Sequence, residues 1–329
     1  MKQDMLDYEA LELTLAICTL NRAELLRDCL NSIASQPSGI VAFEVLVVDN
    51  GSEDSTLAVC AEYAKKLPGF RAVVETKTGL SHARNRAIAE AKGNAIAFID
   101  DDAILCDGWL QAVAQAWNTG KFAAIGGPYD AWHRYGPAPR WFKDEWESNM
   151  PGWPDGALPQ SQYPTGGNCV VSLEWCRRFD GFPTELGMQG NKIRYGEESL
   201  LFKQIQDAGA VLGWTNGMLI HHCVRPDKYG FVWRIRSLIA RGRSYVPVVS
   251  PSFSLKRLVL QMAYTAYGFS KFASCFIRKR FSSPRNMWQT DFLDCGRSFF
   301  FGVGAMLGEF ELPLKCAARR QKRCENIER

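Results

Sequence analysis

Short apolar, β-branched runs alternate with helical patterns along the first hundred residues. Alanine recurs at Ala83, Ala87 and Ala91, which gives one predicted helix a small apolar face. Strands that alternate with helices form βαβ units joined by right-handed crossovers, so the pattern predicts an α/β fold with a doubly wound parallel sheet. We expect strands at about 12–18, 43–48, 71–75 and 95–99, and helices at about 22–35, 54–66 and 81–91.

The periodic pattern stops near residue 128 and returns near residue 166. Residues 128–165 are rich in Pro, Gly and Trp, and a loop of this length inside a compact domain is usually functional. The later pattern predicts an apolar run at 166–172, a helix at about 196–208, strands near 210–213 and 218–222, and a basic helix at roughly 228–245.

The C-terminal part, residues 253–329, predicts two or three amphipathic helices. Their apolar runs fall short of the roughly 18 uncharged residues that a membrane span needs. We therefore expect one domain over 1–250, with a nucleotide-binding half at about 10–127 and an acceptor and catalytic half at about 128–250. A basic helical extension follows over 251–329.

Composition narrows the classes of protein to which the chain can belong. The 329 residues are 47% apolar, which is enough to fill a sizeable core. The eleven cysteines are scattered without CxxC pairs and the acidic N-terminus lacks an apolar signal core, so we expect a reduced, cytoplasmic protein.

Charge divides the chain into two unequal parts. Residues 1–224 hold 19 Lys and Arg against 28 Asp and Glu, a net charge of −9, whereas residues 225–329 hold 20 against 7, a net charge of +13. The basic, aromatic C-terminal part indicates an anionic membrane surface, such as the inner face of the plasma membrane, rather than nucleic acid. The alternative is an ordinary packed extension or a homodimer interface.

Polar residues follow the predicted strands, at the sheet edge where α/β folds bind ligands. Asp100, Asp101 and Asp102 directly follow the fourth strand, and three adjacent carboxylates repel one another unless a cation compensates. A divalent ion, Mg²⁺ or Mn²⁺, shared with a substrate diphosphate would explain them. After the second strand, Asp49 can accept hydrogen bonds from a uracil ring, although the surrounding motif is also ordinary turn chemistry.

Candidate groups for phosphate binding and proton transfer lie at two predicted helix starts. Arg84 offers a planar donor fork suited to phosphate, or only a solubilising charge. Glu197 and Glu198 either cap a helix or include a general base, with Glu198 the first choice. His221 and His222 end an apolar strand and can supply a metal or phosphate contact. Trp132 and Trp153 stack on an acceptor sugar or fill the core; the loop also carries Trp141 and Trp146.

Taken together, these residues resemble family 2 of the glycosyltransferases, the inverting family with a GT-A fold. The resemblance covers about residues 12–245, and it depends on the order and spacing of six short motifs. The motifs are Thr19-Leu20-Asn21-Arg22, Val48-Asp49-Asn50-Gly51-Ser52-x-Asp54, Gly79-Leu80-Ser81-x-Ala83-Arg84-Asn85, Asp-x-Asp at 100–102, Gly166-Gly167-Asn168, and Gly196-Glu197-Glu198.

The resemblance implies a nucleotide-sugar donor, a saccharide or lipid-linked acceptor, and Mn²⁺ or Mg²⁺. It also implies roles for single residues. Thr19, Asn21 and Asp49 would bind the nucleotide, Arg22 and Arg84 would lie near the diphosphate, and Asp100 and Asp101 would lie on the ribose side. Asp102 would bind the metal, with His221 or His222 near metal or phosphate, while Gly167 and Asn168 would border the sugar and acceptor and Glu198 would be the base.

The chain departs from the family pattern at two positions. Asn50 stands where a second Asp is common, and Glu198 stands where Asp is usual, which leaves the choice between Glu197 and Glu198 open. Two other functions stay as alternatives. A nucleotidyltransferase would normally show a Gly-rich phosphate loop near the first strand, and a non-catalytic nucleotide-sugar-binding membrane adaptor would not need the carboxylate pair.

Overall fold

The computed structural model describes residues 11–67, 69–190, 192–249, 252–282 and 287–327. The chain divides into two compact units. The first comprises Met1–Trp132, Asp144–Thr184 and Glu197–Cys223, and the second comprises His133–Lys143, Glu185–Gly196 and Val224–Arg329. Residues 224–249 thus group with the C-terminal helices, whereas the sequence pattern places the division near residue 250.

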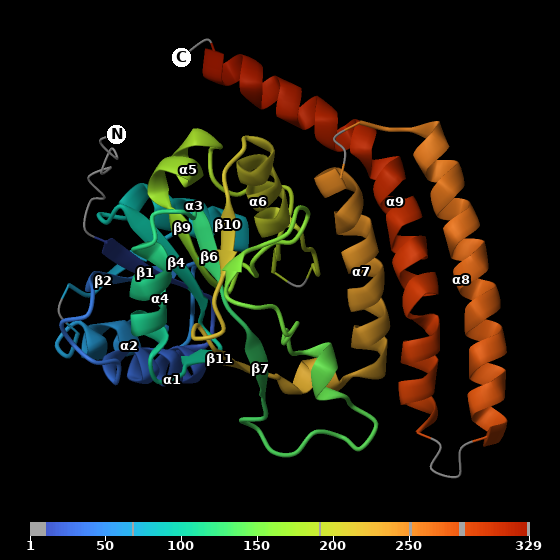
Figure 1. Ribbon diagram of the computed structural model, residues 1–329, viewed down its shortest axis with the longest axis horizontal. Coiled ribbons are helices and arrows are strands. Elements are labelled where there is room, and N and C mark those ends of the chain that lie inside the picture. The colour runs from blue at the N-terminus through green and yellow to red at the C-terminus, as the bar shows by residue number, and fades with distance from the viewer. Residues whose placement is uncertain (1–10, 68, 191, 250–251, 283–286, 328–329) are drawn as a thin grey trace, which may run out of the picture. The chain divides into compact units, whose positions relative to one another are not determined.

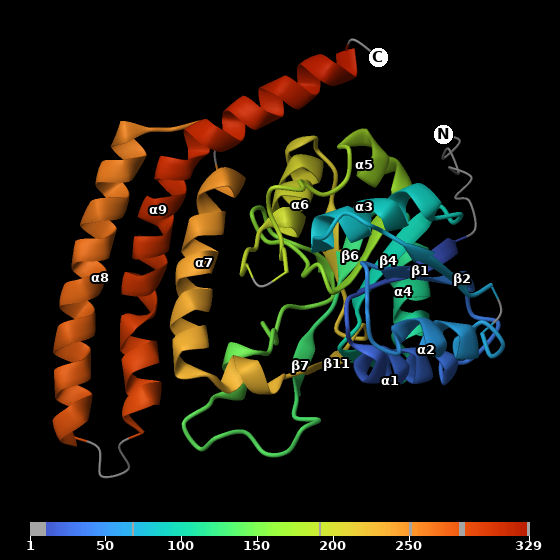
Figure 2. The ribbon, with the colours of Figure 1, turned by 180° about the vertical axis from the view of Figure 1, so that it is seen from behind.

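The first unit is an α/β fold (Figures 1 and 2). The eight strands of its main sheet lie in the order β3-β2-β1-β4-β9-β6-β10-β8, and a small sheet has the order β5-β11-β7. Its elements are β1 (Glu12–Thr19), α1 (Ala23–Ala34), β2 (Ala42–Asp49), α2 (Thr56–Tyr63), β3 (Arg71–Val74), α3 (Leu80–Glu90), β4 (Ala95–Asp100), β5 (Ala103–Leu105), α4 (Trp109–Trp117), β6 (Ala124–Gly126), β7 (Tyr129–Trp132), η1 (Asp144–Trp146), β8 (Gly156–Ala157), β9 (Asn168–Ser172), α5 (Leu173–Arg178), α6 (Glu197–Asp207), β10 (Leu212–Trp214) and β11 (Ile220–Cys223).

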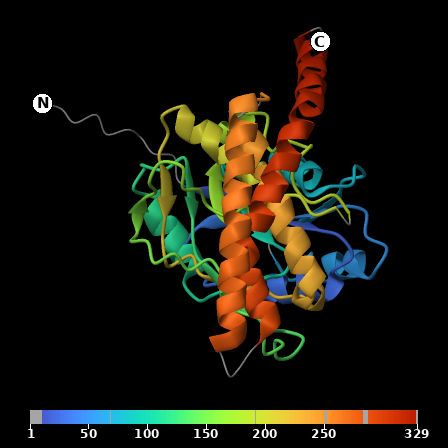
Figure 3. The same ribbon diagram turned by 90° about the vertical axis from the view of Figure 1, so that its right-hand side faces the viewer.

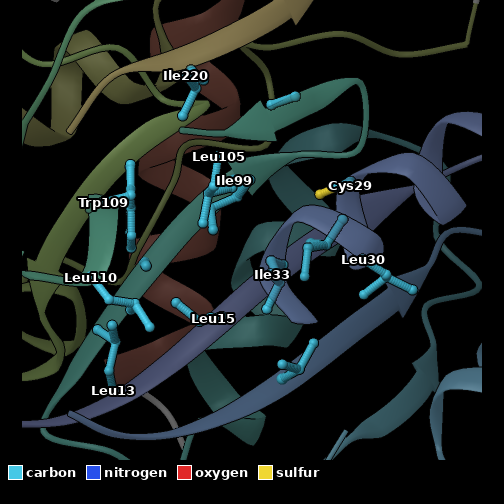
Figure 4. Close-up of a cluster of buried hydrophobic side chains, with 14 of the residues drawn as sticks. Leu13, Leu15, Cys29, Leu30, Ile33, Ile99, Leu105, Trp109, Leu110 and Ile220 are labelled. Atoms are coloured by element: carbon cyan, nitrogen blue, oxygen red, sulfur yellow. The ribbon is translucent and has the colours of Figure 1, made fainter. Parts of the chain in front are cut away.

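Apolar side chains on both faces of the sheet form the core of this unit. Leu13, Leu15 and Ile17 alternate along β1 and are at most 1% exposed, because successive strand residues point to opposite faces. They pack with α1, α2 and α4, and Figure 4 shows this cluster around Leu15, Leu30 and Trp109. The other face packs against α3, α5 and α6. The unit is therefore a sheet between two helical layers, as the sequence predicts.

The sheet is mixed, which corrects the expectation of a parallel one. β1 pairs in parallel with β2 and β4, but β9 runs antiparallel to both β4 and β6. For two strands to run in parallel, a crossover must bring the chain back to the end of the sheet where the first strand began. β9 instead enters from the long loop beside the end of β4, since Asn168 pairs with Ile99. This entry places Gly166, Gly167 and Asn168 at the edge where β4 ends.

The second unit is helical and holds η2 (Pro226–Tyr229), α7 (Phe231–Val249), α8 (Leu255–Ser282) and α9 (Trp288–Ile327). Figures 1 and 2 show α9 between α7 and α8. Glycines permit these close crossings: a Cβ on Gly304 would lie 1.9 Å from the Ile239 carbonyl oxygen of α7, and one on Gly302 would lie 2.4 Å from Thr265 Oγ1 of α8. Among the described residues, no helix is both long and apolar enough to cross a bilayer.

Candidate active site

Strand register brings the first candidate residues together. Thr19 pairs with Asp49 across β1 and β2, and Cys18 pairs with Asp100 across β1 and β4. Thr19, Asp49 and Asp100 therefore lie side by side where three neighbouring parallel strands end. This is the edge at which open α/β sheets bind ligands.

The loops that follow β1 and β2 are joined by hydrogen bonds. Asn21 has a left-handed backbone (φ 55°), which Asn tolerates better than most residues. Its backbone N–H donates to Ser52 Oγ at 2.8 Å, and its side-chain oxygen accepts from the Glu53 N–H at 2.7 Å. Asp49 is 2% exposed and accepts from the Ser52 N–H at 3.0 Å. The predicted nucleotide residues thus form one connected loop pair.

Asn50 explains one departure from the family pattern. Its side-chain nitrogen donates to the carbonyl oxygens of Glu75 and Lys77 at 2.9 and 2.8 Å, and its side-chain oxygen accepts from the Gly79 N–H at 2.7 Å. An ionised Asp can only accept hydrogen bonds, so it could not satisfy the two carbonyl oxygens. Asn50 therefore holds the segment that leads into α3.

Arg22 lies against the acidic cluster. Its Nη1 contacts Asp101 Oδ1 at 2.6 Å and Asp102 Oδ2 at 3.4 Å, and 29% of its side chain is exposed. Asp101 is buried, and this burial raises its pKa to about 6, although the Arg22 guanidinium favours the ionised form. Asp101 is therefore an internal partner of Arg22, and Asp100 and Asp102 are left as the carboxylates of a ligand cluster.

Asp100, Asp102 and His222 bring one ligand atom each to within 4.8 Å of one another. β11 places the histidine, because His222 pairs with Ala103 of β5, directly after the acidic triplet. His222 Nε2 lies 3.3 Å from Asp102 Oδ1, whereas His221 Nδ1 bonds Asp130 on β7. Neighbouring strand residues point to opposite faces, which separates the two histidines. The structure thus assigns His222, and not His221, to the acidic cluster.

Arg84 is buried and bridges three segments of the chain. Its guanidinium donates to Glu197 Oε1 and to the Gly166 carbonyl oxygen, both at 2.9 Å, and lies 3.4 Å from Asp100 Oδ1. Only 4% of the residue is exposed, and the rings of Phe98 and Phe182 flank it. The sequence places Arg84 near a diphosphate. In the structure both of its terminal nitrogens already contact protein groups, and the side chain is buried below the acidic cluster.

Glu197 and Glu198 begin α6 but lie in different environments. Glu197 is 5% exposed and bonds Arg84, whereas Glu198 is half-buried. Burial and the adjacent Glu198 carboxylate raise the pKa of Glu197 to about 8, against the opposing effect of Arg84. Glu197 is therefore the internal member of the pair, and Glu198 is the more accessible one.

The Gly166-Gly167-Asn168 motif supports the site through its backbone. A Cβ on Gly167 would lie 2.0 Å from Asp100 Oδ2, so any larger residue there would have to displace this carboxylate. Asn168 is fully buried: its oxygen accepts from Trp109 Nε1 at 3.0 Å, and its nitrogen donates to the carbonyl oxygens of Pro128 and Met218. Asn168 thus fixes the strand beneath the site and does not reach the surface.

The two tryptophans proposed for an acceptor differ in their surroundings. Trp153 packs edge-on against Trp214, with ring centroids 5.1 Å apart, at the border of the core. Trp132 ends β7, is half-buried and pairs with Cys223 of β11. Sequence reasoning missed Asp130, the partner of His221, because the short strand β7 lies inside a segment that has no periodic pattern.

The fold and this site are typical of one class: α/β proteins that carry a cluster of potential metal ligands where parallel strands end, at the edge where such sheets bind ligands. Comparison with known proteins names the family, because residues 14–173 match the family model "Glycosyl transferase family 2". Residues 14–173 are therefore a glycosyltransferase family 2 domain, and the fold is of the GT-A type. This decides for a glycosyltransferase over the nucleotidyltransferase and the non-catalytic adaptor.

A curated relative is similar in sequence, and two solved structures share the fold. The succinoglycan biosynthesis protein ExoM of Rhizobium meliloti is 26% identical over 247 residues, which cover 72% of this chain and 75% of ExoM. The mannosyltransferase PcManGT of Pyrobaculum calidifontis, solved with GDP-Man and Mn²⁺, has a TM-score of 0.54 at 19% identity. The match covers 94% of this chain and 76% of PcManGT. Residues 1–349 of S. aureus TarS, solved with UDP-GlcNAc, have a TM-score of 0.53 at 14% identity. The match covers 87% of this chain and 89% of that part of TarS.

Proposed function

We propose that the enzyme transfers a sugar from a UDP-sugar to a saccharide or lipid-linked acceptor, with inversion at the anomeric carbon. One observation carries the proposal: Arg84 contacts both Asp100 and Glu197, so a single buried guanidinium fixes the acidic cluster relative to the helix that begins with the glutamate pair. Such preorganisation holds donor and acceptor groups in a reactive arrangement.

The nucleotide would lie at the ends of β1 and β2. Asp49 and Thr19 are paired there, and the Asp49 carboxylate can accept a hydrogen bond from the ring N–H of uracil, the base that we propose. Asn21 and Arg22 would border the same nucleotide. PcManGT was solved with GDP-Man and TarS with UDP-GlcNAc, so GDP-sugars belong in the same test.

A divalent cation fits the cluster of Asp100, Asp102 and His222. Their side chains offer carboxylate oxygens and an imidazole nitrogen, and this mixed set suits Mn²⁺ better than Mg²⁺, which prefers oxygen ligands throughout. When bound, the ion would neutralise charge on the departing nucleoside diphosphate. The adjacent Arg22 adds a partly exposed positive charge on the same side.

Glu198 is proposed as the general base. Its carboxylate takes the proton of the acceptor hydroxyl, whose oxygen forms a bond to the anomeric carbon. The bond from that carbon to the diphosphate oxygen breaks with its electron pair, and the configuration inverts. Glu197 is bonded to Arg84 and so holds the start of α6 in place. Gly167 and Trp132 would border the sugar and acceptor.

The wider role that we propose is polysaccharide or glycoconjugate biosynthesis on the cytoplasmic side of a membrane. The similarity to ExoM, a protein of succinoglycan biosynthesis, supports it, because the match extends over most of both chains. A hexose is the class of sugar that we expect to be transferred.

A panel of nucleotide sugars tests the proposal. UDP-, GDP- and dTDP-sugars are titrated into the full chain with and without Mn²⁺, and release of sugar from each binder is followed by NMR. We expect one UDP-sugar to bind with Mn²⁺ and to give a product of inverted configuration. A retained configuration, or binding of a GDP-sugar alone, would refute the mechanism or the donor, respectively.

A further inference from the structure

The helix α8 has one packed face and one open face. Leu258, Thr265 and Gly268 are buried against the neighbouring helix, and the rings of Phe272 and Phe276 contact Phe292 of α9. These five positions recur at helical spacing, so they form one stripe. In Figure 3 the helix α8, drawn in orange, faces the viewer.

The opposite face, which we call the outer face of α8, is both apolar and basic. Val259, Leu260, Tyr267 and Ile277 are between 56% and 64% exposed, although large apolar side chains usually avoid water in such numbers. Lys256, Lys271 and Arg278 are exposed among them. Spacings of three, four and seven residues place six of these side chains on adjoining rows of the helix, and the seventh, Ile277, lies 18 residues, or five turns, after Val259 on the same face.

The charge of the surrounding segment is one-sided. Between Asp227 and Asp291 the chain holds 12 Lys and Arg and no Asp or Glu. Arg257 points inward and pairs with the buried Glu309, which lies beyond this segment, whereas the cations of the outer face point outward. A surface that combines apolar side chains with uncompensated cations is complementary to anionic lipid headgroups above an apolar interior.

We propose that the outer face of α8 binds the surface of an anionic lipid bilayer, with the helix lying in the interface. The apolar side chains would enter the headgroup boundary, while the long stems of Lys and Arg let their charges reach lipid phosphates. A second copy of the chain fits this face less well. A symmetric dimer would bring the cations of both copies together with no acidic residue of α8 to neutralise them.

Vesicle co-sedimentation of the full chain tests the proposal. We expect binding to phosphatidylcholine vesicles that contain phosphatidylglycerol, weaker binding as salt increases, and little binding to phosphatidylcholine alone. Each cation near such a surface contributes roughly fivefold to the partition coefficient, so Lys271→Gln with Arg278→Gln should lower it about 25-fold. Leu260→Ser with Ile277→Ser should lower it by at least about tenfold, even when the two side chains enter the bilayer only in part.

A matched control removes two exposed lysines from the other unit, Lys65→Gln with Lys92→Gln, and should leave partitioning within about twofold. Equal losses for the control and the α8 variant would overturn the site. So would failure to bind phosphatidylglycerol vesicles at low salt. A dimer in light scattering that Leu260→Ser with Ile277→Ser dissociates would assign the face to a second copy. Vesicle binding is measured without donor or acceptor, so it fails or succeeds independently of the proposed transfer reaction.

Discussion

Replacing Arg84 by Met tests whether the contacts of its buried guanidinium stabilise the folded site. The change keeps an unbranched apolar side chain between Phe98 and Phe182 but removes the guanidinium that bonds Glu197, Gly166 and Asp100. Near pH 9, above the Glu197 pKa of about 8, both partners are charged, and breaking a buried ion pair on one side then costs about 3–5 kcal/mol because the partner is left uncompensated. We expect a loss of this size in the free energy of unfolding.

Arg86→Met on the same helix is the matched control. The Arg86 side chain is 41% exposed and pairs with Glu90 four residues later, a type of contact that contributes only about 0.3–0.5 kcal/mol. Urea unfolding followed by tryptophan fluorescence measures both variants. If Arg84→Met destabilises the protein no more than Arg86→Met does, the reasoning is wrong.

A double-mutant cycle with Glu197→Gln isolates the pair itself. Once Arg84 is absent, removing the Glu197 charge should cost little or even stabilise, so the two single losses should exceed the double loss by about 1–3 kcal/mol. Losses that add without coupling would mean that the 2.9 Å contact does not stabilise the folded chain.

Three further predictions concern the glutamate pair and the glycine motif. Glu198→Gln should lower transfer roughly 10²–10⁴-fold and leave donor binding intact, while Glu197→Gln retains transfer; the reverse pattern would make Glu197 the base. The pKa of Glu197 is about 8 when folded and 4.5 in its ordinary state, so the folded protein holds a proton that unfolding releases. The free energy of unfolding should therefore fall as pH rises through this window, by at most about 1.4 kcal/mol per unit, and a Glu197→Gln variant with an unchanged slope would contradict this. Gly167→Ala should displace Asp100 and weaken Mn²⁺ binding at least about tenfold, and an unchanged Mn²⁺ titration would show that the 2.0 Å approach is harmless.

Local periodicity was sufficient to predict the parallel half of the fold. The predicted strands at 12–18, 43–48, 71–75 and 95–99 match β1 to β4 within one residue at each end, because buried parallel strands are continuous apolar runs between helices. The short strands β5 to β8 escaped prediction. Two to four residues are too few to show a period, and their pairing is set by partners distant in the chain.

The site was predictable as a set of residues but not as a network. The motifs select Asp100 and Asp102, the end of a predicted strand selects the histidine pair, and strand register then places His222 at the cluster. No sequence pattern shows that Arg84 is buried or that Asn168 is completely enclosed, since both facts depend on packing between distant segments. Burial also separates Glu197 from Glu198, which the motif alone leaves equivalent.

If Asp100, Asp102 and His222 bind a divalent cation together with the diphosphate of a nucleotide sugar, UDP binding should depend on that cation. Calorimetric titration of UDP into the full chain, with and without Mn²⁺, tests it most directly, with Asp102→Asn as the matched variant. We predict that UDP binding requires Mn²⁺ and weakens at least roughly 10–100-fold in Asp102→Asn. Equal UDP affinity with and without Mn²⁺, or in the wild type and Asp102→Asn, would contradict it.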